Sequence, residues 1–284
     1  MKQVSLWSLS HDDGAEAVGP DDRIHGSWLI LTLPSGHLTL INRQRIRART
    51  RGIVMLIGIL QTGDVPSSFR AETGDYPAIF EKMLSGRGLT FKAFAVLRDE
   101  FPPGVNSCEG WLITGSPSSA YDADPWIARL KEFIRAAYEA RIPVVGICFG
   151  HQVIAEAMGG KVEKYPGGWS IGATEYAFDG QPLTLNAWHR DQVIRKPDMA
   201  RVIASNAFCK NAALLYDGPI LSIQPHPELD GNFISHLIDE AVHESVPIPD
   251  DLIATARANL DAETDSTQIA DRIAQFFKDN QSRR

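Results

Sequence analysis

A cysteine at the junction of a buried strand and a helix is the feature that most constrains the fold of this chain. In the stretch VVGICFGHQVIAEAMGG, the residues Val144 to Ile147 are mostly β-branched and follow Pro143, which predicts a short strand buried on both faces. Phe149 to Met158 carries apolar residues at helical spacing. Cys148 therefore lies where the strand becomes the helix, and the chain must turn sharply there.

This junction is typical of a reactive thiol. Gly146 and Gly150 lie on either side of Cys148 in the pattern G-x-nucleophile-x-G, in which small neighbours allow a strained turn that exposes one side chain above a sheet. Free N–H groups at the start of the helix favour the thiolate over the thiol. The alternative is a buried structural cysteine, because free cysteine is among the most buried residue types.

Strand and helix patterns alternate from Met55 onward, which predicts the α/β class with an open, mostly parallel sheet between two layers of helices. Helices are expected at 76–85, 125–140, 149–158, 230–244, 249–260 and 266–278. Strands are expected at 55–60, 90–96, 110–115 and 144–147, and after the cysteine helix at KVEKY, IGATEYAF, LTLNAWH, ARVIAS, AALLYDG and ILSIQ. In such a sheet, ligands bind beyond the carboxyl ends of the strands, so the loop QTGD at 61–64 should share a crevice with Cys148.

Three segments are expected along the chain: an N-terminal extension at 1–54, a catalytic domain at 55–246 and a helical appendage at 247–284. The extension has seven Lys and Arg against five Asp and Glu, or +2, so the remainder of the −7 chain carries −9. A short hairpin is expected within 27–41. The extension is otherwise interpreted as a poorly ordered tail, as a basic arm for an acidic partner, or as sequence upstream of a true start at Met55.

Net charge and cysteine count exclude several classes of protein. The charge of −7 argues against a general nucleic-acid or acidic-membrane partner, and no stretch approaches the roughly 20 apolar residues of a membrane span. Cysteines at 108, 148 and 209 form neither a disulfide framework nor a metal-binding pair, so no metal and no cofactor are expected. A reducing, cytoplasmic compartment fits these free thiols.

A candidate base for the thiol follows another apolar strand, in ILSIQPHPE. Pro227 disfavours helical geometry at His226, and residues i and i+2 of an extended chain point to the same side, so the His226 imidazole and the Glu228 carboxylate can meet. Cys148, His226 and Glu228 then have the roles of nucleophile, base and orienting group. A solvated loop after the strand is the alternative for His-Pro-Glu taken alone.

The oxyanion formed by thiolate attack on a carbonyl needs preorganised donors, for which backbone N–H groups serve best. Phe149 supplies one from the start of the helix, and the loop ITGSPSSAYD offers Gly115 and Ser116 at the end of the neighbouring strand. A plain turn is the alternative for this loop alone.

Together, GICFGHQVIAEAMGG, TGSPSSAYD and QPHPE resemble the class I glutamine amidotransferases, over about residues 55 to 245. GDYPAIFEKML and NAWHRDQV are similar to stand-alone, GMP-synthase-like members, including the γ-glutamyl peptidases. The resemblance implies a flavodoxin-like three-layer fold with extra antiparallel strands. It also implies a γ-glutamyl thioester on Cys148, proton transfer by His226 and an oxyanion hole made by Gly115 and Phe149.

The resemblance also implies a pocket for the substrate. Gln152 matches the position that contacts bound glutamine, and His189 and Asp191 lie in a segment beside the pocket, where a structural role at a strand end is the alternative. Ser116 is a further substrate-binding candidate. The loop reads Gly-Ser-Pro where many synthetase-linked members read Gly-Gly-Pro, and this departure bears on ammonia channelling more than on hydrolysis.

The leading function is therefore hydrolysis of glutamine or another γ-glutamyl amide or peptide. The first alternative is a glutaminase subunit that delivers ammonia to a separate synthetase partner. The second is a catalytically silent regulatory or binding protein on the same fold, and a redox or stress-response protein is a further class. The His-Pro-Glu tripeptide argues against the redox class, because a redox sensor has no use for a base and its orienting group.

Overall fold

The computed structural model describes residues 28–32, 38–42 and 54–281, and the chain divides into two compact units, Met1–Gly52 and Ile53–Arg284. In the first unit, β1 (Trp28–Thr32) pairs antiparallel with β2 (Leu38–Asn42), which confirms the two expected hairpin strands. The expected turn, the basic arm and the interpretations as tail or upstream sequence lie outside the described residues.

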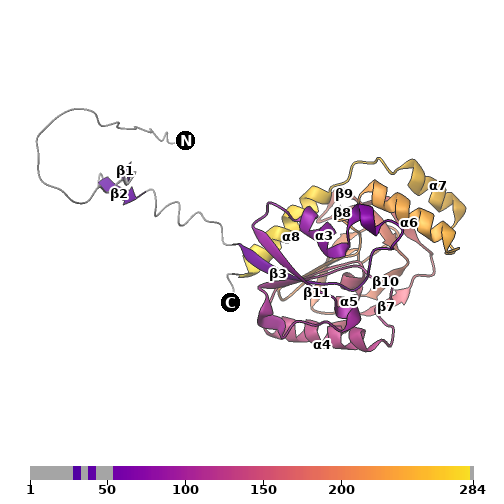
Figure 1. The fold of residues 1–284 in the computed structure, drawn as a ribbon, viewed down its shortest axis with the longest axis horizontal. Coiled ribbons are helices and arrows are strands. Elements are labelled where there is room, and N and C mark those ends of the chain that lie inside the picture. Colours follow the sequence, from indigo (N-terminus) through magenta and orange to yellow (C-terminus); the bar gives the residue numbers. More distant parts are fainter. Residues whose placement is uncertain (1–27, 33–37, 43–53, 282–284) are drawn as a thin grey trace, which may run out of the picture. The chain divides into compact units, whose positions relative to one another are not determined.

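The second unit is built on a nine-stranded mixed sheet of order β4-β3-β5-β6-β13-β12-β11-β8-β9 (Figure 1). The strands of its parallel part are β3 (Met55–Leu60), β4 (Leu89–Phe94), β5 (Gly110–Ile113), β6 (Val144–Ile147) and β13 (Ile220–Ile223). The sheet continues antiparallel through β12 (Ala213–Tyr216), β11 (Ala200–Ser205), β8 (Ser170–Phe178) and β9 (Gln181–His189). This arrangement confirms the predicted α/β class with extra antiparallel strands.

Helices cover both faces of the parallel part, so the unit has three layers (Figure 1). On one face, α4 (Pro125–Glu139) and α5 (Phe149–Ala157) share a core with Trp111 and Ile113 of β5. On the other face, α3 (Tyr76–Met83) and α8 (Ser266–Gln281) share a core with Ile57 and Ile59 of β3. Neighbouring side chains of a strand point to opposite faces, which is why these apolar strands are buried on both sides.

The remaining elements are η1 (Val96–Arg98), η2 (Val105–Ser107), α2 (Arg70–Thr73), α6 (Gly231–His243), α7 (Asp250–Ala258) and a two-stranded sheet of β7 (Lys161–Lys164) and β10 (Asp191–Arg195). The elements β10, α2, η1 and η2 were not expected from the sequence, whereas every helix and strand that was predicted for this unit is present. No helix of the described residues is long and apolar enough to cross a lipid bilayer.

The segment after residue 246 forms the expected helices, but α8 packs deeply in the domain. Ile269, Ile273 and Phe277 are fully buried, and a Cβ atom at Gly110 would lie 2.8 Å from the Phe277 ring. Because α8 supplies one helical layer of the sheet, we propose that the catalytic domain extends through α8 and does not end at residue 246.

Candidate active site

Cys148 occupies the strained turn that its two glycine neighbours predict. It joins β6 to α5 with φ 53° and ψ −103°, a conformation that a non-glycine residue rarely adopts. A Cβ atom at Gly150 would lie 2.5 Å from the Ile113 carbonyl oxygen, and one at Gly146 would lie 2.5 Å from the Gly150 backbone. Both positions therefore require glycine for the backbones to approach one another.

His226 and Glu228 meet as the His-Pro-Glu sequence predicts. The Nδ1 atom of His226 lies 2.7 Å from Oε1 of Glu228, and the Glu228 side chain is fully buried. The backbone of His226 is held from β9, because its N–H donates to the Asn186 carbonyl at 2.8 Å, while the Asn186 side chain donates to the carbonyl of Leu229 at 2.9 Å. Sequence reasoning missed Asn186, although it lies in the noted NAWHRDQV segment.

The side chains of Cys148 and His226 both lie close to Gly115. A Cβ atom at Gly115 would lie 3.3 Å from Cε1 of His226 and 3.9 Å from Cβ of Cys148. Glu228 occupies Nδ1 of His226, and Nε2 has no hydrogen-bond partner among the described residues. The Cys148 thiol makes a long contact with the Trp188 carbonyl oxygen, at 4.0 Å.

The electrostatics of this cluster favour a charged imidazole. Burial opposes protonation of His226, but the neighbouring Cys148 thiolate and Glu228 carboxylate outweigh burial and hold the pKa of His226 well above its usual range. A protonated imidazole beside a cysteine side chain is the arrangement that nucleophilic catalysis by a thiol requires.

Two carbonyls orient the peptides of the loop after β5. The Thr114 carbonyl accepts from the N–H of Gly150 at 3.2 Å, so the N–H of Gly115, which is antiparallel to it, points away from α5. The Gly115 carbonyl accepts from the Thr62 hydroxyl at 2.9 Å. Because the C=O and N–H of a trans peptide are antiparallel, the N–H of Ser116 in that peptide points away from the Thr62 hydroxyl.

A cavity of about 510 Å³ opens beside Cys148 and contains all three predicted substrate-binding residues: Gln152, Ser116 and His189. Its other lining residues include the indole pair Trp169 and Trp188, the cationic Lys164 and Arg190, and the acidic Asp191, Glu240 and Glu244. The loop after β3 packs against the loop after β5, since a Cβ atom at Gly63 would lie 3.0 Å from the Gly115 carbonyl oxygen. The loops therefore meet as expected, but the residue that lines the cavity from the β3 side is Pro66 and none of residues 61–64 does so.

Gln152 and His189 differ in how they are held. The Gln152 amide donates to the Asp191 carbonyl at 2.9 Å and to the Gln224 side chain at 3.0 Å. Both ring nitrogens of His189 lack a partner among the described residues, and the side chain is buried. Burial, and secondarily the charge on His226, lower the pKa of His189 to about 3, so this ring faces the cavity as a neutral group.

The other cysteines lie away from this cavity. Cys108 and Cys209 are buried, and burial raises the pKa of both thiols, to about 12 for Cys209. A second cavity of about 550 Å³ is lined by Glu228 and Arg87 but not by Cys148. Within the described part of the chain, no three His, Cys, Asp or Glu side chains are grouped as a metal site would require.

Comparisons with known proteins agree with this architecture. The chain is 27% identical to γ-glutamyl peptidase 2 of Arabidopsis thaliana over 218 residues, covering 72% of this chain and 88% of that protein. It is 38% identical over 135 residues to one subunit of the glutamine-hydrolysing GMP synthase of Methanopyrus kandleri, covering 42% of this chain and 66% of that relative.

Among solved structures, the crystal structure of a glutamine amidotransferase from Methylobacillus flagellatus superimposes with a TM-score of 0.63, covers 81% of this chain and 94% of that one, and is 22% identical, which shows a shared fold. The family model of the class-I glutamine amidotransferases matches residues 90–239, more than half of the chain. The protein is a member of the class-I glutamine amidotransferase family.

Proposed function

We propose that the protein hydrolyses γ-glutamyl amides through a thioester on Cys148, with His226 as proton donor and acceptor and Glu228 as its orienting group. The observation that carries this proposal is the position of His226, whose Nδ1 is bound to Glu228 while Nε2 is left for the thiol beside it. The strained conformation of Cys148 supports it, because such strain persists where function requires it.

The proposed reaction has two halves. The Cys148 thiolate attacks the γ-carbonyl carbon, a carbon–sulfur bond forms, and the carbonyl electrons move to oxygen. The tetrahedral intermediate then expels the amine, which takes the proton from Nε2 of His226 and leaves a γ-glutamyl thioester. In the second half, water attacks the thioester and gives a proton to His226. Glutamate departs, and the thiolate and imidazolium return.

Two backbone donors for the oxyanion are proposed, the N–H groups of Phe149 and Ser116. Phe149 begins α5, so its N–H precedes the hydrogen-bonded part of the helix. Ser116 takes the place of Gly115 in the expected hole, because the Gly115 carbonyl is held on the β3 side. Gly115 keeps a role in this proposal as the residue whose lack of a side chain makes room beside His226.

The size and lining of the cavity favour a γ-glutamyl amide with a leaving group larger than ammonia. A volume of about 510 Å³ lies in the range of pockets for drug-sized ligands. Lys164 and Arg190 supply positive charge for a carboxylate, while Glu240 and Glu244 supply negative charge for an ammonium group. The aromatic surface of Trp169 and Trp188 is left for an apolar leaving group. The similarity to a γ-glutamyl peptidase supports this choice.

The second candidate is a glutaminase subunit that passes ammonia to a separate synthetase. The similarity to the GMP synthase subunit of Methanopyrus kandleri favours it, although the matched region covers 42% of this chain. The retained cluster of Cys148, His226 and Glu228 argues against the alternative of a catalytically silent regulatory protein. A cytoplasmic location remains a proposal, supported by the three free cysteines of the described chain.

The test is the release of glutamate and of ammonia or amine from glutamine and from a panel of γ-glutamyl amides and dipeptides. The full-length wild type is compared with Cys148→Ala, and with Cys209→Ala as a control for removing a buried cysteine away from the cavity. Turnover by the wild type and by Cys209→Ala, but not by Cys148→Ala, is expected without a partner. An inactive wild type that a glutamine-like chloroketone still labels at Cys148 would favour the glutaminase-subunit function instead, and absence of labelling would contradict both functions.

A further inference from the structure

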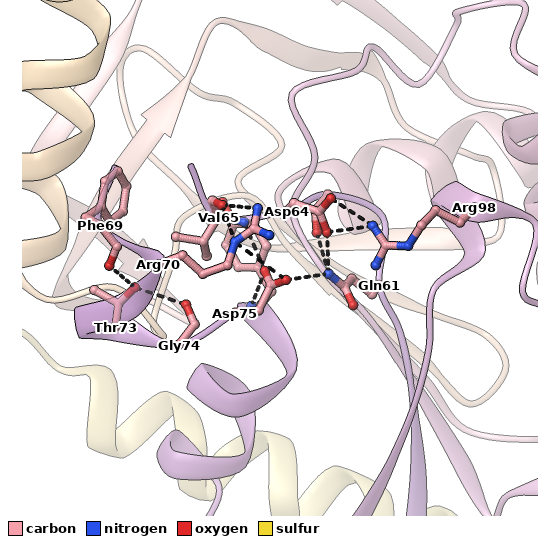
Figure 2. Close-up of polar contacts among 11 residues, drawn as sticks. Gln61, Asp64, Val65, Phe69, Arg70, Thr73, Gly74, Asp75 and Arg98 are labelled. Carbon is pink, nitrogen blue, oxygen red and sulfur yellow. Dashed lines mark hydrogen bonds and ion pairs between the residues drawn. The ribbon is translucent and has the colours of Figure 1, made fainter. Parts of the chain in front are cut away.

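The loop that follows β3 is fixed by a dense set of side-chain hydrogen bonds (Figure 2). The amide of Gln61 donates to the carbonyl of Gly63 at 3.1 Å, to Asp64 at 2.7 Å and to Asp75 at 3.1 Å. The Nη1 atom of Arg98 donates to both carboxylate oxygens of Asp64, at 3.0 and 2.8 Å. Together with the Gln61 contacts, this ion pair restrains the first turn of the loop.

The far end of the same loop is fixed through Asp75. Its Oδ1 atom accepts from the N–H groups of Val65 and Tyr76, both at 2.9 Å, while Oδ2 accepts from Gln61 (Figure 2). The guanidinium of Arg70 donates to the Val65 carbonyl. One carboxylate therefore joins both ends of the loop and also caps the first turn of α3.

Thr62 lies inside this fixed loop and is directed at the loop after β5. Its N–H donates to the Thr114 hydroxyl at 3.0 Å, and its own hydroxyl lies 2.9 Å from both the Thr114 and the Gly115 carbonyl oxygens. Thr62 and Thr114 are both buried. The Thr114 hydroxyl also lies 3.1 Å from the Gly115 carbonyl oxygen. The Gly115 carbonyl oxygen thus lies within hydrogen-bond distance of both buried hydroxyls, on the side of the peptide that faces the loop after β3.

We propose that Thr62 is a positioning residue for catalysis, which sets the direction of the Ser116 N–H by holding the Gly115 carbonyl. This inference rests on the proposed function. A trans peptide is planar, so a carbonyl fixed toward β3 leaves its N–H fixed toward Cys148. Donors that are oriented before the reaction stabilise a developing oxyanion without reorganisation, whereas a peptide free to rotate loses that advantage.

A purely structural role would be the satisfaction of buried carbonyls, and the two roles differ in a measurable way. Alkylation of Cys148 by iodoacetamide displaces iodide from carbon and forms no oxyanion. Acylation by a γ-glutamyl substrate does form one. Misdirection of the Ser116 N–H should slow acylation alone, whereas general damage to the site should slow both reactions of the same thiol.

The experiment compares Thr62→Val, which removes the hydroxyl at nearly constant volume, with Thr62→Ser, which retains it. For the substrate that the wild type cleaves best, Thr62→Val should lower kcat by about 10- to 100-fold with little change in KM. Its rate of alkylation by iodoacetamide should stay within about twofold of the wild type, and Thr62→Ser should recover most of kcat. Thr174→Val is the matched control, because the Thr174 hydroxyl also donates to a glycine carbonyl, that of Gly172 at 3.1 Å.

Three results would overturn the inference. One is a wild-type kcat in Thr62→Val, and another is an equal loss of acylation and alkylation in that variant. The third is an inactive wild type, which would overturn the proposed function and, with it, the role assigned to Thr62. An active wild type beside an unaffected Thr62→Val would remove the positioning role alone and leave the proposed function standing.

Discussion

The Nδ1 atom of His226 lies 2.7 Å from Oε1 of the buried Glu228 carboxylate. This contact fixes the orientation of the ring and assigns the proton of Nδ1 to the carboxylate side. It also leaves Nε2 facing the reactive side of the site, next to Cys148 and Gly115. The two residues lie close in sequence, with Pro227 and Glu228 in a turn that directly follows His226, so the contact is local, while Asn186 anchors the His226 backbone.

Glu228→Gln should lower kcat by about 100-fold and lower the pKa of His226. The amide keeps the shape of the carboxylate but removes one of the charges that raise that pKa, so the imidazolium will lose its proton at a lower pH. Steady-state kinetics and titration of the His226 ring by NMR would measure the two effects. Glu139→Gln, at an exposed position of α4, serves as the control, and an unchanged pKa in Glu228→Gln would contradict the assignment.

Gly115→Ala should reduce kcat by about 10-fold or more while the protein stays folded. The added methyl group would lie 3.3 Å from His226 and 3.9 Å from Cβ of Cys148, which displaces the ring or fills space that the substrate needs. Gly104→Ala is a matched control, because its Cβ atom would meet nothing within 4 Å. Steady-state kinetics would measure the effect on kcat, and thermal unfolding would measure any loss of stability. A fully active Gly115→Ala would show that neither the His226 ring nor the substrate needs this space.

Gly150→Ala should destabilise the fold by about 2 kcal/mol or more. Its Cβ atom would approach the Ile113 carbonyl oxygen to 2.5 Å, which forces α5 away from β5. The free energy of unfolding from urea denaturation is the measurement, with Gly104→Ala again as reference. A loss below about 0.5 kcal/mol would mean that the helix can move at little cost, and that the approach is not required.

Acidification should reduce stability as the pH falls from about 6.5 toward 3. Burial lowers the pKa of His151 and His189 to about 3, whereas the unfolded chain titrates near 6.5, so the unfolded state binds more protons in this window. The stability these neutral rings contribute is complete above pH 6.5 and is lost as the pH falls. His226 has the opposite sign, because its pKa is raised in the folded state. Its contribution to stability grows as the pH falls through about 6.5 and levels off once the unfolded chain is protonated as well, so it offsets only part of the loss.

Urea denaturation at pH 7 and pH 5 would measure this loss for the wild type and for His151→Gln. The free energy of unfolding should differ less between pH 7 and pH 5 in the variant than in the wild type, because one of the two buried imidazoles is gone. His243→Gln, at an exposed position, should retain the whole difference. An identical pH dependence in the wild type and in His151→Gln would contradict the buried, neutral state of His151.

Trp169→Ala should impair cleavage of γ-glutamyl amides with aromatic leaving groups more than cleavage of glutamine. The Trp169 and Trp188 rings lie 6.1 Å apart and line the cavity beside Cys148, so an apolar leaving group has this surface to bury against. The ratio of kcat/KM for the two substrates is expected to fall by about 10-fold, from the apolar area lost. An equal loss of kcat/KM for both substrates would contradict the binding of the leaving group against Trp169.

Much of the fold was predictable because local signals were strong. The apolar run before Cys148 and the helical pattern after it predicted β6 and α5, and both are present. The elements missed, which are α2, β10 and the two 3-10 helices η1 and η2, are short and lack a periodic pattern. β10 pairs with β7 although residues 165–190 lie between them in the chain, and such a pairing depends on tertiary contacts more than on propensity.

By itself, the sequence determined the strained turn at Cys148, the His-Pro-Glu unit and the alternation of strands and helices, because each depends on neighbouring residues and local sterics. Only the tertiary structure decided that the Thr62 hydroxyl contacts the Gly115 carbonyl, 53 residues away in the chain. The same holds for Asn186, which anchors His226 from another strand. Hydrogen bonds between distant segments leave no periodic trace in a sequence, and the order of the strands in the sheet brings those segments together.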